Sequence, residues 1–159
     1  MQKKLGWSRY GNPKYVSAVY RYLVFSSNGK WGSPFVGKDW NSRVSSDFGW
    51  RTDPLNGKKA FHEGLDIAYP TGTKIHAVSG GVVTSVVYSK TGYGHHVRVD
   101  CGNGVTVLYA HCSKILVTKG QSISTGQAIA EVGATGRVTG AHLHLGVPVS
   151  TIRMKDRSW

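Results

Sequence analysis

Residues 97–109 read VRVDCGNGVTVLY, two runs of alternating apolar residues on either side of an Asn-Gly pair. Asn-Gly between two such runs is a strong signal for a two-residue turn that joins antiparallel strands. The stretch therefore predicts a β-hairpin whose turn is Asn103-Gly104.

Similar short runs recur on both sides of this hairpin, separated by Gly, Asn, Pro and Ser. The predicted strands are 44–50, 60–68, 73–79, 80–88, 94–101, 104–112, 127–132 and 142–149. Residues 120–127 are predicted to be a turn-rich connection. Glycine supplies 21 of the 159 residues and proline only 5, which favours a turn-rich β protein over a helical bundle. The pattern predicts an all-β fold, a small antiparallel β-sandwich or folded sheet.

The chain has the length of one domain, with a distinct segment at each end. We expect the domain to span residues 44–149 and residues 150–159 to form a C-terminal tail. Residues 1–43 are basic and aromatic and are interpreted as an N-terminal extension or linker. Aromatic rings interleaved with Lys and Arg suit single-stranded nucleic acid, but packing onto the domain is the favoured use.

The formal net charge is +12, which favours anionic partners: nucleic acid, acidic membranes or an anionic wall polymer. A cationic surface that serves only solubility explains the charge equally well. No stretch approaches the roughly 20 apolar residues of a membrane span. The first residues have a charged start without an apolar run behind it, so no export signal is visible in this segment.

The two cysteines are predicted to be free thiols. With Asn103-Gly104 as the turn, Cys101 faces Thr106 and Cys112 lies opposite His95. The two sulfur atoms would then be about 20 Å apart along the hairpin, far beyond the reach of a disulfide. Cys112 follows His111 and would point to the other face of the strand, which argues against a role as metal ligand.

Two pairs of polar residues stand at strand spacing. His62 and Asp66 are four apart, and His142 and His144 are two apart, so each pair can point to one side of a strand. Two imidazoles and a carboxylate that converge can form a three-ligand zinc site with an open position, as a hydrolytic metal requires. The alternative is that these are ordinary polar residues on solvated strand faces. The presence of both pairs in one small domain favours a shared site.

The segment around His62 is predicted to be a strand and not a helix. His62-Glu63 invites comparison with the helical H-E-x-x-H zinc motif, but the fifth residue here is Asp66. Gly64 lies inside the segment, and glycine in a helix costs about 1 kcal/mol relative to alanine. Turn signals flank it at 53–57 and 68–72. On a strand Glu63 faces away from the site, and it is assigned no catalytic role.

A third histidine segment, Tyr109-Ala110-His111, closes the second strand of the hairpin. This histidine can be structural. A neutral imidazole with a pKa of about 6.5 can also move protons at neutral pH or hydrogen-bond a developing oxyanion.

Five short motifs together resemble the lysostaphin-type zinc endopeptidases, the M23 peptidase family. Their order and spacing match that family over residues 45–149. The motifs are Ser46-Asp47-Phe48-Gly49-Trp50-Arg51, His62 to Ala68, Gly92-Tyr93-Gly94, Tyr109-Ala110-His111 and Gly140-Ala141-His142-Leu143-His144. The resemblance implies one zinc ion bound by His62, Asp66 and His144, with His111 and His142 as the catalytic pair. It also implies a small antiparallel β domain with the site in a groove between loops.

The chain departs from the family pattern at several positions. Leu145-Gly146 follow the H-L-H motif where many members have Phe-Glu, and Cys101 and Cys112 stand where His and Leu are expected. Residues 1–43 match nothing in the family. None of these departures touches the five site residues, so we expect the chain to be catalytically competent.

The function that the resemblance implies is a zinc metalloendopeptidase that cuts peptide bonds of bacterial peptidoglycan. The bond can lie in a stem peptide, a glycine-rich cross-bridge or a direct cross-link. The alternatives are a non-catalytic wall-binding or hydrolase-activating module and, from charge and aromatics alone, a nucleic-acid-binding β domain. No signature of a nucleic-acid-binding fold supports the last. We expect a secreted monomer that acts outside the cell or in the cell wall, without a nucleic acid partner.

Overall fold

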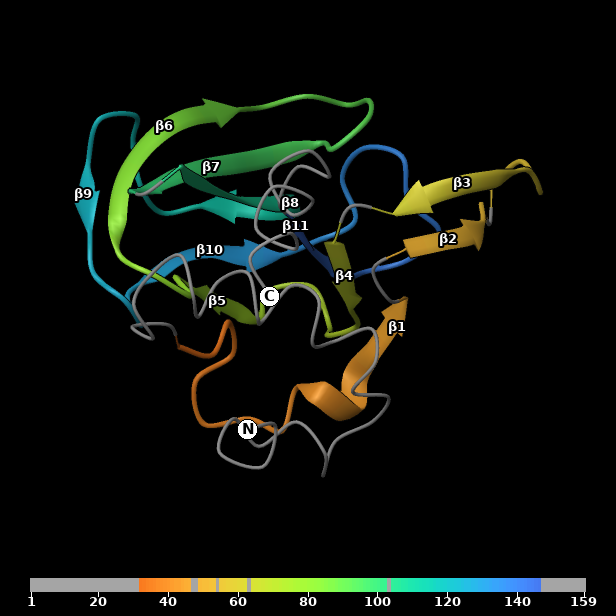
Figure 1. Ribbon diagram of the computed structural model, residues 1–159, viewed down its shortest axis with the longest axis horizontal. Helices are drawn as coiled ribbons and strands as arrows, with labels where there is room; N and C mark the ends of the chain where they lie inside the picture. The colour runs from red at the N-terminus through yellow and green to blue at the C-terminus, as the bar shows by residue number, and fades with distance from the viewer. Residues whose placement is uncertain (1–31, 47–48, 54, 63, 103, 147–159) are drawn as a thin grey trace.

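The computed structural model describes residues 32–46, 49–53, 55–62, 64–102 and 104–146. The regular secondary structure in this part of the chain consists of strands and one 3-10 turn, η2 (Asn41–Arg43), which precedes them (Figure 1). The strands are β1 (Val44–Ser46), β2 (Gly49–Thr52), β3 (Lys59–His62), β4 (Gly64–Ile67), β5 (Lys74–His76), β6 (Gly81–Val87), β7 (His95–Gly102), β8 (Val105–Ile115), β9 (Ser122–Ile123), β10 (Ala128–Val132) and β11 (Leu143–Gly146).

Nine strands form one sheet with the order β1-β4-β11-β8-β7-β6-β9, and β10 joins β8 to β5 beside this path. Strands β2 and β3 form a separate hairpin that projects to the right in Figure 1. The pairings within the described residues are antiparallel throughout, which confirms the predicted all-β antiparallel fold. In the same part of the chain no helix is long and apolar enough to span a membrane.

The core lies on one face of the β7–β8 hairpin. Alternate residues of these strands, Val97 and Val99 on β7 and Val107 and Tyr109 on β8, are fully buried there. The Tyr109 hydroxyl accepts a hydrogen bond from the Val78 amide at 3.0 Å, so its polar atom does not remain unsatisfied. Buried Val, Ile and Leu side chains on β4, β5, β6, β9, β10 and β11 continue this cluster.

The described part of the predicted N-terminal extension packs onto this core. Phe35 and Trp40 are 0% and 4% exposed, and the Phe35 ring lies 4.3 Å from the Tyr69 ring. The backbone of Gly32 also donates to the carbonyl of Val78 at 2.6 Å. Residues 1–31 lie outside the described residues, as does the predicted tail at 150–159.

The predicted hairpin is present, but its register differs at one point. Cys112 pairs with His95 as expected, and Gly102 pairs with Val105. Thr106, however, pairs with Asp100 and not with Cys101. The expected pairing of Cys101 was wrong because the register shifts between Asp100 and Gly102, which leaves Cys101 as an extra residue in β7.

Both cysteines are free, and we expect them to react slowly in the native protein. Burial raises the pKa of Cys112 to about 12 and that of Cys101 to about 11, so few thiolates exist at neutral pH. A thiol reagent at pH 7 should label both residues at least tenfold faster in denaturant than in buffer. The intact mass should be the same before and after reduction; a gain of two hydrogens on reduction would reveal a disulfide.

The predicted single strand at 60–68 is two strands in different sheets. β3 pairs with β2, whereas β4 pairs with β1 and β11. Gly64 opens β4 and faces Gly146 on β11, and an added Cβ there would overlap the carbonyl oxygen of Leu145. The predicted turn-rich connection also differs, because Ser122–Ile123 form β9 within it. Residues 147–149 of the predicted strand 142–149 lie outside the described residues.

We expect Gly64→Ala to destabilise the fold by about 2 kcal/mol or more, because the new methyl group can be accommodated only by moving β11. Gly140→Ala is the matched control, since nothing lies within 4 Å of the Cβ position there. Its effect should stay within about 0.5 kcal/mol. Urea unfolding of the two variants measures both values, and equal stabilities would contradict the close approach of β4 to β11.

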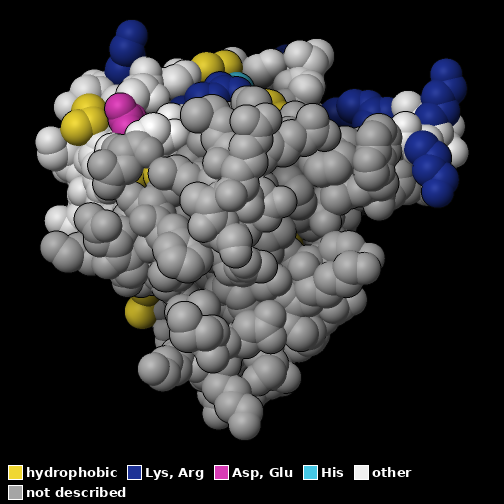
Figure 2. Space-filling model, viewed as in Figure 1, with side chains coloured by type: hydrophobic (Ala, Val, Ile, Leu, Met, Phe, Trp, Pro, Cys, Tyr) yellow, Lys and Arg dark blue, Asp and Glu magenta, His cyan; other side chains and the backbone are white. Residues whose placement is uncertain are grey.

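Basic side chains are conspicuous at the edge of the molecule. Figure 2 shows Lys and Arg side chains over the β2–β3 hairpin, where Lys58 and Lys59 are exposed. The hairpin precedes β4 along the chain: β3 ends at His62, and β4, which carries Asp66, begins at Gly64.

Candidate functional site

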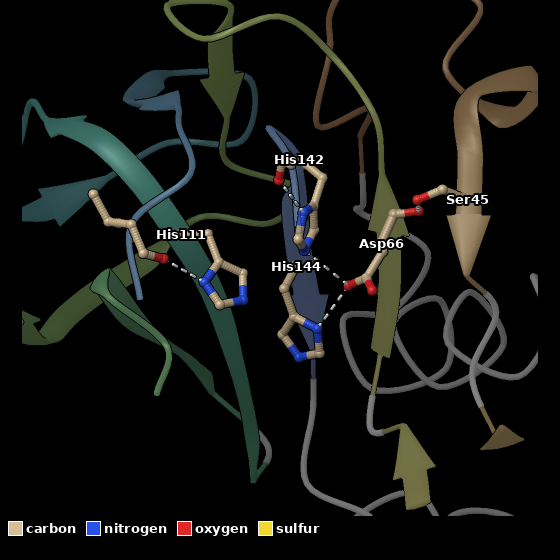
Figure 3. Close-up of polar contacts among 7 residues, drawn as sticks. Ser45, Asp66, His111, His142 and His144 are labelled. Atoms are coloured by element: carbon tan, nitrogen blue, oxygen red, sulfur yellow. Dashed lines mark hydrogen bonds and ion pairs between the residues drawn. The ribbon is translucent and has the colours of Figure 1, made fainter. Parts of the chain in front are cut away.

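Asp66 and His144 face each other across the β4–β11 pairing. Residues directly opposite in an antiparallel pair point to the same side of the sheet, so the two side chains meet. The Nδ1 atom of His144 lies 3.0 Å from the Oδ1 atom of Asp66, and both residues are 6% exposed (Figure 3). The sheet itself thus brings together two of the three predicted metal ligands.

His142 approaches the same carboxylate from the segment that precedes β11. Its Nε2 atom lies 3.6 Å from Asp66 Oδ1, and its Nδ1 atom lies 2.9 Å from the carbonyl oxygen of Gly140. A carbonyl oxygen only accepts, so this contact assigns the proton of neutral His142 to Nδ1 and leaves the Nε2 lone pair on the site side. The expectation that His142 and His144 point to one side is confirmed.

His111 enters the site from β8 with an unusual backbone conformation. Its φ is 64°, a left-handed value that is rare outside glycine, and its amide donates to the carbonyl of Tyr93 at 2.8 Å. The residue lies at a shift in the β7–β8 register between the pairs that His95 and Val97 make. Its ring centroid is 4.9 Å from that of His142, which brings the predicted catalytic pair into contact.

Burial lowers the pKa of His111 to about 4, although its hydrogen bond to the carbonyl of Thr135 acts in the opposite direction. The nearby imidazoles of His142 and His144 lower this pKa further when they are charged. His111 is therefore a neutral imidazole at pH 7. Its Nδ1 atom lies 2.7 Å from the Thr135 carbonyl oxygen, so the proton is on Nδ1 and the lone pair on Nε2.

Thr135 is a site residue that the sequence reasoning missed. Its carbonyl orients the His111 ring, while its Oγ1 donates to the carbonyl of Cys112 at 2.8 Å and accepts from the amide of His95 at 3.0 Å. One residue of the loop after β10 thus holds β7, β8 and the His111 ring in fixed relation. Thr135 follows His111 by 24 positions, and no local pattern connects the two residues.

Tyr93 forms a wall of the site. Its ring stacks on that of His144, with centroids 5.5 Å apart and planes at 25°, and lies 6.4 Å from the ring of His111. The residue is 38% exposed, so the phenol is accessible from solvent. The motif Gly92-Tyr93-Gly94 belongs to the family resemblance, but by itself it indicates no role for the tyrosine.

The residues that meet here have the donor chemistry of a zinc site. Zinc takes imidazole nitrogen and carboxylate oxygen at about 2.0–2.2 Å, which separates two ligand atoms of one tetrahedral ion by about 3.3 Å. The 3.0 Å between His144 Nδ1 and Asp66 Oδ1 is close to that value, so these two residues are compatible with a shared zinc ion. The third predicted ligand is His62, whose side chain is not among the parts that the structure describes. Among the described residues, no group of three His, Cys, Asp or Glu side chains could hold a metal ion.

Comparison with known proteins gives a family match over most of this domain. Residues 60–155 match the model of peptidase family M23. The peptidoglycan DD-endopeptidase ShyA of Vibrio cholerae is 44% identical over 103 residues, which cover 64% of this chain and 24% of ShyA. The chain therefore spans about a quarter of the length of the curated relatives it matches.

Solved structures of similar fold agree with this family match. The catalytic domain of a variant of the prophage-encoded M23 protein EnpA from Enterococcus faecalis has a TM-score of 0.59 and 36% identity, covering 72% of this chain and 81% of that one. A zinc-containing peptidase from Vibrio cholerae has a TM-score of 0.58 and 36% identity, covering 65% of this chain and 33% of the other.

Proposed function

The chain belongs to peptidase family M23, and on that premise we propose that it is a zinc-dependent endopeptidase that hydrolyses peptide bonds in the stem peptides or cross-bridges of bacterial peptidoglycan. The observation that carries the proposal is the convergence of three imidazoles on one side of the sheet beside the Asp66 carboxylate. The name of ShyA, a peptidoglycan DD-endopeptidase, supports the substrate class.

In this proposal His62, Asp66 and His144 hold the zinc ion. Zinc, when bound, supplies a Lewis acid for the scissile carbonyl and lowers the pKa of water toward neutrality. The zinc-containing peptidase from Vibrio cholerae supports this choice of metal.

The two remaining histidines, His111 and His142, accept and donate protons during the reaction. Both His111 and His142 direct their Nδ1 protons at backbone carbonyls, which leaves Nε2 as the basic atom. One such imidazole accepts the proton of the attacking water. Once charged, it donates a hydrogen bond to the developing oxyanion or the proton to the leaving amine. The low pKa of His111 keeps this residue in its basic form at neutral pH.

Thr135→Val is expected to reduce kcat about tenfold with little change in KM. The loop loses its hydroxyl contacts to β7 and β8, so the Thr135 carbonyl that orients the His111 ring is no longer held in place. Thr135→Ser keeps the hydroxyl and should restore most of the rate. Zinc content should equal that of the wild type in both variants. If Ser and Val behave alike, the Thr135 hydroxyl does not position His111.

The proposed function is tested by zinc analysis together with mass spectrometry of fragments released from purified walls of defined chemotype. About one zinc per chain and release of peptide fragments would support an endopeptidase and reveal the bond that is cut. Wall binding with zinc present but without fragments would favour the alternative, a non-catalytic wall-binding or activating module. We further propose that the protein acts as a monomer outside the cell or in the cell wall, in keeping with that substrate.

A further inference from the structure

Arg98 carries a charge close to the site that the proposed mechanism does not use. It lies on β7 between Val97 and Val99, whose side chains are fully buried in the core. Because side chains alternate along a strand, Arg98 and His96 point to the opposite face of the sheet.

His96 holds the guanidinium group of Arg98 in place. Its Nε2 atom lies 2.9 Å from Arg98 Nη1, and its Nδ1 atom lies 2.9 Å from the carbonyl oxygen of Gly94. Guanidinium only donates and a carbonyl only accepts, so His96 is neutral with its proton on Nδ1. His96 is 8% exposed, and its orientation is fixed at both ring nitrogens.

Tyr93 connects this arginine to the site. The Arg98 Cζ atom lies 5.8 Å from the centroid of the Tyr93 ring, which itself lies 5.5 Å from that of His144. The guanidinium carbon is therefore within about 11 Å of the His144 ring. An extended peptide spans this distance in about three residues, at roughly 3.3–3.6 Å per residue.

The charge of Arg98 has no acidic partner in the part of the chain that the structure describes. The ion pairs there involve Lys74, Arg137, His142 and His144. The half-buried guanidinium group of Arg98 is held by the neutral His96 imidazole and lies over the Tyr93 ring. Its other N–H groups remain available as donors, and the planar guanidinium matches the geometry of a carboxylate.

We propose that Arg98 binds a free carboxylate of the substrate within about three residues of the scissile bond. This inference rests on the proposed function and narrows its substrate class to acidic peptides, such as stem peptides with free carboxylates. A glycine-rich cross-bridge has no side-chain carboxylate to offer this arginine.

The test compares soluble cross-linked muropeptides with the same preparation after its carboxylates are converted to neutral amides. Charge-assisted hydrogen bonds contribute about 1.5–3 kcal/mol, which corresponds to roughly 10- to 100-fold in kcat/KM. The wild type should prefer the native muropeptides by that factor. Arg98→Gln should lose the preference through a higher KM and cleave amidated muropeptides at the wild-type rate. Arg98→Lys should recover only part of it.

Lys119→Gln is the matched control, because it removes one exposed positive charge in the segment between β8 and β9. This variant should keep the full preference, and every variant should retain wild-type zinc content and melting temperature. Equal cleavage of both substrates by the wild type would overturn the inference while leaving the proposed function intact. An Arg98→Gln variant that still prefers native muropeptides, or that loses equal activity on both, would also overturn it. Failure of the zinc-loaded wild type to cleave either substrate would refute the proposed function, and the inference with it.

Discussion

Asp66→Ala is expected to lower the zinc content from about one equivalent to less than a tenth after dialysis, with loss of wall hydrolysis. The substitution removes one of the three proposed ligands and also the carboxylate that Nδ1 of His144 contacts at 3.0 Å. His62→Ala and His144→Ala should lower the zinc content equally, because each removes one of only three proposed protein ligands. Metal analysis of the dialysed variants measures this directly.

The control is Asp39→Ala, which removes an exposed carboxylate before η2. It should retain zinc and activity. Any of the three ligand variants that holds a full equivalent of zinc would show that its residue is not a ligand. The result for His62→Ala is the most informative of the three, since the other two residues already lie together in the structure.

His111→Ala and His142→Ala are expected to retain zinc and to lose about a hundredfold or more of the hydrolytic rate. Each removes an Nε2 lone pair beside the site, and loss of one general-base or oxyanion contact has effects of this size. The measurement is zinc content beside the initial rate of fragment release from walls.

His76→Ala is the matched control, because His76 is a partly buried histidine on β5 that contacts Pro34 instead of the site. Its rate should stay within about twofold of the wild type. If His111→Ala or His142→Ala loses its metal together with its activity, that residue is a ligand. Near-normal rates with zinc retained would exclude the proposed proton transfer.

The antiparallel fold could be predicted because its signals are local. Alternating apolar residues and an Asn-Gly turn predict paired strands wherever they occur, and the β7–β8 hairpin follows them. The ends of the strands were less predictable. β3 and β4 read as one run, yet they pair with different partners, and β9 is a two-residue strand defined by its pairing with Gly81 and Val82.

The pair His142 and His144 could be read from spacing alone, because residues two apart on extended backbone share a side. The same reasoning for His62 and Asp66 relied on a single strand, and that premise was wrong because β3 ends at His62 and β4 begins at Gly64. The residues are still predicted ligands, through the family motif and not through strand alternation.

The sequence by itself determined the all-β class, the family and the residue types available for a metal and for proton transfer. Strand alternation, turn chemistry and short motifs each depend on only a few neighbouring residues. Only the tertiary structure decided which groups meet. The left-handed backbone of His111, the Thr135 carbonyl that orients its ring and the Tyr93 ring between Arg98 and His144 all depend on pairings between distant strands and loops. Such contacts arise from packing across the sheet, and no spacing along the chain encodes them.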